Sequence, residues 1–268
     1  MKIGCDVPSW LRPASQNTPS GRNATRPERG AYQMVTVRPA QKSVRPKAHF
    51  SGPHSYLRPM VPAHMPSIIT SLFPRWTWHM PRTERVLYLT FDDGPSPGIT
   101  DWVLEQLTAY QARATFFSIG DKVLRHPETL LKVQSAGHAI GNHTQHHLNL
   151  WKTPLTTYLA DKDQCQEALR DVLGREVKLF RPPYGKMTPR AARRILPQHE
   201  IVMWDVIAGD YDQQIGPDRV TQNVLRHARE GSIVVFHDSE KCERRMRHAL
   251  PVVLEHFASK GFEFRSLE

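Results

Sequence analysis

From residue 85 onward, short apolar segments typical of strands alternate with longer segments of helical periodicity. Residues 85–92 (RVLYLTFD) form a β-branched and aromatic run that stops at Gly94-Pro95, and residues 100–110 follow with a capping Thr100 and apolar residues at helical spacing. Such alternation favours a parallel sheet, because each helix returns the chain to the same edge of the sheet. The further strands expected are 113–119, 138–142, 177–180, 201–206, 232–236 and 262–264, and the further helices are 128–136, 155–173, 188–196, 218–230 and 246–260.

This pattern predicts an α/β fold, a single distorted (β/α) barrel of about seven parallel strands within residues 65–268. Such barrels carry their chemistry at the carboxyl ends of the strands. Two polar clusters, at residues 92–93 and 143–147, directly follow expected strands. We therefore expect both clusters on the catalytic face of the barrel.

The first 64 residues differ from the rest in charge and composition. The chain has a formal net charge of +10, and residues 1–64 hold ten basic side chains against only Asp6 and Glu28. The segment is rich in Pro, Ser, Gly and Asn and cannot offset its ordering entropy by burial, so we expect a disordered leader. A basic arm could bind nucleic acid, but a solvated segment is the simpler interpretation, and we expect no nucleic-acid partner. Translation from Met65, just before SIITSLFPRWTW, would omit the leader.

The sequence shows neither an export signal nor a membrane span. The opening MKIGCDVPSWLRPASQ is interrupted by Asp, Pro and Arg, and no run of about 18 apolar residues occurs. We therefore expect a cytoplasmic protein, and we expect a monomer.

Cys5, Cys165 and Cys242 are odd in number and irregularly spaced, which argues against a disulfide framework and against a Cys-ligated zinc site. Free thiols are expected.

The two polar clusters contain carboxylates and histidines at suggestive spacing. Asp92 and Asp93 end an apolar strand, where a cation or hydrogen bonds would have to offset their desolvation, although a tight turn capped by Asp would also explain the pair. His143 and His147 are four residues apart and would share one face of a helix, with His146 pointing elsewhere. The glutamate of the HExxH zinc-peptidase motif is missing, so a general base would have to come from another segment.

Together the clusters offer one carboxylate and two neutral imidazoles. Asp93, His143 and His147 would bind a divalent cation and leave coordination positions open, as in a catalytic rather than a structural zinc site. Zinc is favoured by these ligand types, and Co²⁺ or Mn²⁺ would also fit. If Asp93 is a ligand, the neighbouring Asp92 is free to act as a general base.

Five ordered segments resemble the signature motifs of the polysaccharide deacetylase (NodB-homology) family, also called carbohydrate esterase family four. The resemblance spans about residues 85–266 and implies the barrel fold, a divalent metal and hydrolysis of an acetyl group. The matching segments are TFDDGP at 90–95, HTQHH at 143–147, RPPYG at 181–185, WDVIAGDY at 204–211 and IVVFH at 233–237.

The resemblance also implies a role for each matching residue near the metal. Asp92 would be the catalytic base, and Asp93, His143 and His147 would be the metal ligands. Arg181 would orient Asp92 through a charge-assisted hydrogen bond.

Further roles follow from the later motifs. His237 would be the general acid that protonates the leaving amine, with Asp210 raising its pKa. The backbone N–H of Tyr184 would stabilise the oxyanion, and Val235 stands where the family commonly has a leucine lining the pocket for the acetyl methyl. The chain departs from the family at Ile207, where a carboxylate is frequent, which bears on the polar network around the arginine and on substrate preference.

These features predict a metal-dependent hydrolase that deacetylates N-acetylglucosamine-containing glycans, chitooligosaccharide or peptidoglycan, with a metal-activated water. An acetylxylan O-esterase could use the same residues, since a leaving alcohol demands less of the acid. A non-catalytic glycan-binding protein is a third interpretation, but every proposed catalytic group is present. Trp204 is expected in the core rather than as a platform for sugar.

Overall fold

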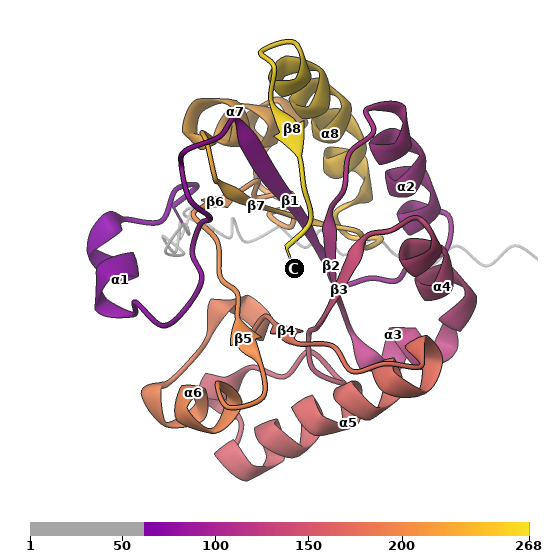
Figure 1. The fold of residues 1–268 in the computed structure, drawn as a ribbon, viewed down its shortest axis with the longest axis vertical. Helices are drawn as coiled ribbons and strands as arrows, with labels where there is room; N and C mark the ends of the chain where they lie inside the picture. The colour runs from indigo at the N-terminus through magenta and orange to yellow at the C-terminus, as the bar shows by residue number, and fades with distance from the viewer. Residues whose placement is uncertain (1–61, 268) are drawn as a thin grey trace, which may run out of the picture. The chain divides into compact units, whose positions relative to one another are not determined.

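In the computed structural model, residues 62–267 are described, and strands alternate with helices along them (Figure 1). The leader predicted for residues 1–64 lies outside the described residues except for its last three. The strands are β1 Val86–Asp92, β2 Thr115–Ser118, β3 Ala139–Asn142, β4 Leu179–Phe180, β5 Glu200–Ile201, β6 Val206–Ile207, β7 Ile233–His237 and β8 Glu263–Phe264. The helices are α1 Ser67–Leu72, α2 Ile99–Ala109, α3 Gly120–Arg125, α4 Pro127–Ser135, α5 Leu155–Leu173, α6 Pro189–Ile195, α7 Pro217–His227 and α8 Glu243–Ala258, with 3-10 turns η1 Leu150–Lys152 and η2 Pro183–Gly185.

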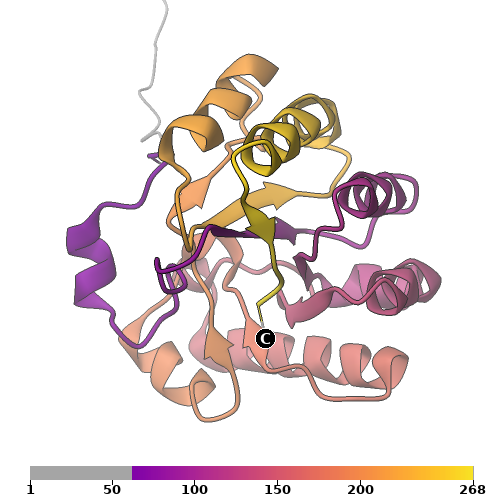
Figure 2. The same cartoon turned by 45° about the horizontal axis from the view of Figure 1, so that its top comes forward.

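The strands form a parallel sheet that curves into a distorted barrel, as the sequence predicts. Their order is β5-β4-β3-β2-β1-β7-β6, and β8 pairs with the start of β1. Figure 2 shows the larger helices arranged outside the strands. Although β5 and β6 lie at opposite ends of this order, only residues 202–205 separate them in sequence. This short connection brings the two ends of the sheet together.

The single strand predicted for residues 201–206 is therefore wrong. Its first residue belongs to β5 and its last to β6, and the residues between cross from one end of the sheet to the other. The carbonyls of Val202 and Met203 accept hydrogen bonds from the buried Arg181 side chain, at 3.3 and 2.9 Å. A distant side chain thus takes part in fixing this crossing segment, which the local apolar pattern could not indicate.

The segment before β1 lies alongside this crossing. Met65 N donates to Asp205 O at 2.8 Å, Ile207 N donates to Ala63 O at 2.9 Å, and His64 forms an antiparallel bridge with β6. Further on, Thr77 forms a parallel bridge with Val202. Both views place α1 outside β5 and β6 (Figures 1 and 2). Residues 63 and 64, assigned to the leader, therefore pair with the barrel.

Alternation along the strands separates two apolar clusters and positions the site. In β1, Leu87, Leu89 and Phe91 pack in the cluster that includes residues of α2, α5, α7 and α8. Successive strand residues point to opposite faces, so Thr90 and Asp92 point the other way, into the barrel. In β7 the same rule assigns Val234 and Phe236 to the helix side and Ile233 and Val235 to the inner cluster. The catalytic residues at the ends of these strands therefore also point into the barrel.

Helix boundaries follow local signals to different degrees. The helix predicted for residues 155–173 is confirmed at both ends, and Gly174 closes it in the left-handed conformation, with φ 69°. Thr100, expected as a capping residue, lies inside α2, whose N-cap is Gly98. Its hydroxyl instead accepts a hydrogen bond from Ser96 N at 2.8 Å. The short α3, before α4, was not predicted.

Two cysteines lie within the described residues, Cys165 and Cys242, and both are free and buried, as expected. Cys5 lies outside them. Among residues 62–267, no helix combines the length and apolar character needed to cross a membrane.

Candidate active site

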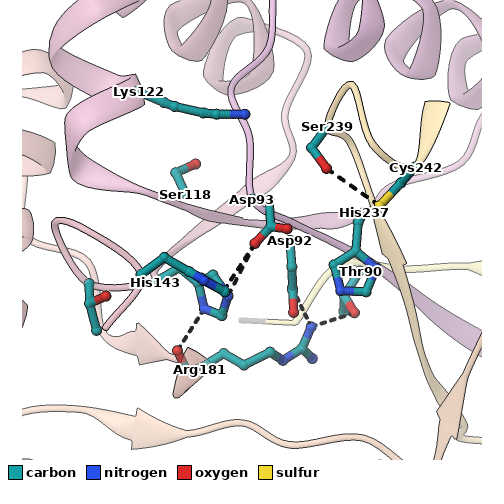
Figure 3. A network of polar contacts seen from close by, with 12 residues as sticks. Thr90, Asp92, Asp93, Ser118, Lys122, His143, Arg181, His237, Ser239 and Cys242 are labelled. Atoms are coloured by element: carbon teal, nitrogen blue, oxygen red, sulfur yellow. Dashed lines mark hydrogen bonds and ion pairs between the residues drawn. The ribbon is translucent and has the colours of Figure 1, made fainter. Parts of the chain in front are cut away.

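The predicted site residues converge at the carboxyl ends of the strands, around a cleft of about 460 Å³. Seven of them line the cleft, and the other two, Arg181 and Asp210, lie fully buried beside it. Figure 3 shows Asp92 and Asp93 between His143 and His237. The cleft-lining members are Asp92, Asp93, His143, His147, Tyr184, Val235 and His237.

Three side chains form a ligand set suited to a divalent cation. Asp93 Oδ1 lies 3.2 Å from His147 Nε2 and 3.7 Å from His143 Nε2, and it has no hydrogen-bond partner although it is buried. His143 Nδ1 lies 2.8 Å from the Arg181 carbonyl, which can only accept, so Nδ1 carries a proton and Nε2 is the ring nitrogen that faces Asp93. Burial and the neighbouring His143 lower the pKa of His147 to about 4, which keeps that imidazole neutral. The donor set therefore fits a metal.

The HTQHH segment reaches this geometry as a loop and not as a helix. Residues 143–147 follow β3 without helical structure, and Thr144 and His147 have φ of 65° and 55°. Asp161 on α5 holds the loop by accepting hydrogen bonds from the backbone N–H of Gln145 and His146 and by contacting His146 Nδ1 at 2.6 Å. The two ligands thus face one point because of loop conformation, and His146 instead anchors the loop.

Asp92 is held by a buried arginine. Arg181 Nη1 donates to Asp92 Oδ1 at 2.7 Å and to Thr90 Oγ1 at 2.7 Å, and the guanidinium lies 4.1 Å from the ring centroid of Phe117. Thr90 in turn donates to the carbonyl of Val234 at 2.9 Å. With its carboxylate fixed at the cleft, Asp92 has the position that a general base needs.

His237 and Asp210 form the second charged pair of the cleft. Asp210 Oδ1 lies 2.8 Å from His237 Nδ1, and its other oxygen accepts from the backbone N–H of His237 at 2.8 Å. Burial lowers the pKa of His237, but the charge and hydrogen bond of Asp210 outweigh it and raise the pKa to about 9. The imidazole is therefore protonated at neutral pH and can donate a proton from Nε2.

The remaining wall of the cleft is apolar, with one exposed aromatic ring. Val235, Ile207 and Trp204 line it and are buried, so Trp204 belongs to the core and also contacts the cleft. Tyr184 adopts φ 60° within η2, and its ring centroid lies 4.5 Å from that of His147. Ile207, where the family often has a carboxylate, leaves Arg181 with Asp92 as its only carboxylate partner among residues 62–267.

Sequence reasoning missed three supporting residues. Thr90 could have been found from strand alternation, because it shares the inward face of Asp92. The sequence offered only a weak signal for Asp161, which is a carboxylate at a buried position of α5. Asp238 is fully buried beside Gly94, accepts a hydrogen bond from Thr100, and has its pKa raised by burial to about 7. No local pattern indicated that contact.

Comparison with known proteins identifies the family of this chain. The family model for polysaccharide deacetylase matches residues 79–204. A Bacillus cereus peptidoglycan-N-acetylglucosamine deacetylase is 32% identical over 200 residues, which cover 70% of this chain and 89% of that protein. This chain belongs to the polysaccharide deacetylase family. The family resemblance and the class of hydrolase predicted from the five motifs are confirmed.

Other relatives differ in named substrate and in length. An Azorhizobium caulinodans chitooligosaccharide deacetylase is 35% identical over 162 residues, covering 59% of this deacetylase and 75% of the relative. The crystal structure of the Bc1960 peptidoglycan N-acetylglucosamine deacetylase superposes with a TM-score of 0.70 at 28% identity, covering 76% of this chain and 95% of that one. The chain spans only 39% of the longer Listeria monocytogenes deacetylase PgdA.

Proposed function

We propose that this protein is a metal-dependent N-deacetylase that removes acetyl groups from N-acetylglucosamine residues of a glycan. One observation carries the proposal. The unpartnered Asp93 Oδ1, the base held by Arg181 and the imidazolium held by Asp210 all face a single cleft. A binding protein on this fold would have no need of all three arrangements. The relatives named as deacetylases of peptidoglycan and of chitooligosaccharide support the same reaction.

Asp93, His143 and His147 would hold the metal, with Zn²⁺ favoured by the ligand types and Co²⁺ or Mn²⁺ as substitutes. When bound, the cation supplies Lewis-acid activation of a water molecule and of the amide carbonyl. The lone pair of His143 Nε2 is directed at this position because Nδ1 is engaged by the Arg181 carbonyl. This contact also prevents His143 from turning away.

The side chains around that position divide the proton transfers. Asp92 takes a proton from the attacking water, and its pairing with Arg181 fixes the carboxylate orientation during attack on the carbonyl carbon. The backbone N–H of Tyr184 donates to the developing oxyanion. His237 then transfers a proton to the amide nitrogen, so that the C–N bond breaks to give acetate and a free amine. Val235 contacts the acetyl methyl.

The raised pKa of His237 supports N-deacetylation over ester cleavage. An amine is a poor leaving group unless it is protonated as the C–N bond breaks, whereas an alkoxide needs less help. An imidazole with a pKa of about 9 stays charged at neutral pH and retains this proton for the leaving nitrogen. Cleavage of acetylxylan esters is the second candidate, since the same groups can perform it.

Acetate release from N-acetylglucosamine oligomers tests the proposal. We expect release by the full chain that is lost with a chelator, restored by Zn²⁺, and abolished in Asp92→Asn. Asp218→Asn, which alters an almost fully exposed carboxylate, is the matched control and should retain activity. Release that persists in metal-free protein, or in Asp92→Asn, contradicts the mechanism. Faster release from acetylxylan than from the oligomers would favour the esterase.

A further inference from the structure

Two lysines line the mouth of the catalytic cleft. Lys186 follows η2 on one side, and Lys241 follows β7 on the other. The only carboxylates that line the same cleft are Asp92 and Asp93, both assigned to the reaction. The mouth therefore carries positive charge without an acidic residue of its own.

Lys186 is held in place by an aromatic ring. Its Nζ lies 3.8 Å from the ring centroid of Trp151, a side chain with 64% of its surface exposed on η1. The turn carrying Trp151 is fixed by a hydrogen bond from Trp151 N to Asn149 Oδ1 at 3.0 Å. A cation–π contact of this kind restrains the ammonium without neutralising its charge. Lys186, a cleft-lining residue, thus carries a restrained positive charge.

Lys241 also lacks a compensating acid. Its carbonyl accepts a hydrogen bond from Gln213 Nε2 at 2.8 Å, which fixes the backbone, while its side chain is exposed. The adjacent carboxylate of Glu240 instead lies 3.6 Å from Lys122 Nζ. Across residues 62–267, neither Lys186 nor Lys241 takes part in an ion pair.

The reaction itself does not require these two charges. Asp92 is balanced by Arg181, His237 is balanced by Asp210, and Asp93 faces the position proposed for the cation. The catalytic charges are therefore matched among themselves. A neutral glycan offers only hydroxyl and amide groups to the mouth, whereas a carboxylate beside either lysine would gain a charge-assisted contact.

We propose that the cleft is specific for a glycan that carries a carboxylate beside the acetylated sugar, and that Lys186 and Lys241 are its specificity-determining residues. The inference rests on the proposed deacetylase function. A lactyl ether of the kind found in the glycan strand of peptidoglycan supplies such a carboxylate, and chitooligosaccharide does not. Trp151 acts as a positioning residue for Lys186.

The test compares two forms of one substrate with the full chain. Peptide-free peptidoglycan strands are used with free lactyl carboxylates and with the same carboxylates converted to primary amides, and chitotetraose is the neutral reference. We expect kcat/KM for acetate release to be about ten-fold higher on the acid than on the amide, through KM, and to lose this preference in high salt. One partly exposed ion pair contributes up to about five-fold.

Substitutions then assign the preference to the two lysines. Lys186→Met and Lys241→Met should each lower the acid-to-amide ratio by about three-fold, while Lys178→Met, an exposed lysine outside the cleft, should leave it unchanged. Trp151→Ala should lower the ratio in the same direction as Lys186→Met, through KM rather than kcat. Equal kcat/KM on acid and amide, or a ratio unaffected by both lysine substitutions, overturns the inference.

The neutral reference separates this inference from the proposed function. Acetate release from chitotetraose and both strands at equal efficiency leaves the deacetylase in place and removes the anionic specificity. No release from any of the three removes the proposed deacetylase function. Calorimetric binding of the acid and amide strands then still tests the two lysines, and equal affinity for both overturns their role.

Discussion

Replacement of Arg181 by Met should both destabilise the protein and lower its catalytic activity. The guanidinium has no exposed surface and makes four hydrogen bonds, to Asp92, Thr90 and the carbonyls of Val202 and Met203. Methionine fills a similar length but donates no hydrogen bond. The substitution leaves the Asp92 carboxylate buried without its cation. It also removes the hydrogen bonds from Arg181 to the segment between β5 and β6.

The expected loss is about 3–5 kcal/mol of unfolding free energy, the usual result of removing one partner of a buried ion pair. The unpaired carbonyls add to this cost, although water can enter at the cleft side and offset part of it. For a folded region of about 200 residues, a loss of this size lowers Tm by roughly 10 °C. Acetate release should fall by about 100-fold or more, because the base loses its orientation.

Thermal unfolding and acetate release of the same preparations provide the assay. Arg113→Met is the matched control, since Arg113 is exposed and donates to a single carbonyl, that of Ala136, at 2.7 Å. Its unfolding free energy should stay within about 0.5 kcal/mol of the parent. If the unfolding free energy of Arg181→Met lies within about 1 kcal/mol of that of the parent, the buried pair does not stabilise the barrel.

Four further outcomes are expected. Asp210→Asn should move the alkaline fall in activity from near pH 9 toward the ordinary histidine pKa of about 6.5, because the charge that raises the pKa of His237 is gone. A pH–rate profile whose alkaline limb does not move refutes this expectation. The same pair should stabilise the parent fully below about pH 6.5 and cease to do so as pH rises through about 9, which unfolding at several pH values checks. His143→Ala should lower bound zinc, measured by elemental analysis after dialysis, to well below one equivalent. Gly94→Ala would place a methyl against the buried Asp238 carboxylate and should cost about 1–3 kcal/mol in denaturant unfolding, whereas an unchanged midpoint would show that the turn can move.

Much of the architecture follows from local sequence because it depends on short-range periodicity. The run at residues 85–92 is apolar at alternate positions and ends in a turn, so it had to form a strand with one face in each core cluster. The helix at residues 155–173 is set by its own periodicity and by Gly174. The order of the motifs likewise supplied the nine candidate site residues, eight of which lie at a strand end or in the loop after it, whereas Val235 lies within β7.

Backbone conformation at the site was decided by tertiary contacts. Asp93, Thr144, His147 and Tyr184 all have positive φ, which is unfavourable for residues other than glycine and is tolerated where surrounding contacts hold it. The histidine spacing suggested a helical face, but the loop reaches the same convergence through Asp161 on α5. A contact of this kind has no signature in the loop's own residues.

What sequence alone determined is therefore the inventory of chemical groups and the succession of strands and helices, because both are properties of neighbouring residues. Tertiary structure decided which groups act on one another. Asp92 and Arg181 form a hydrogen bond although they are 89 residues apart in the sequence. The two carbonyls that also accept hydrogen bonds from Arg181 belong to the segment wrongly expected to be one strand. Lys186 acquires its place from Trp151 in another loop. These contacts join segments that are far apart in the sequence, and no local periodicity encodes them.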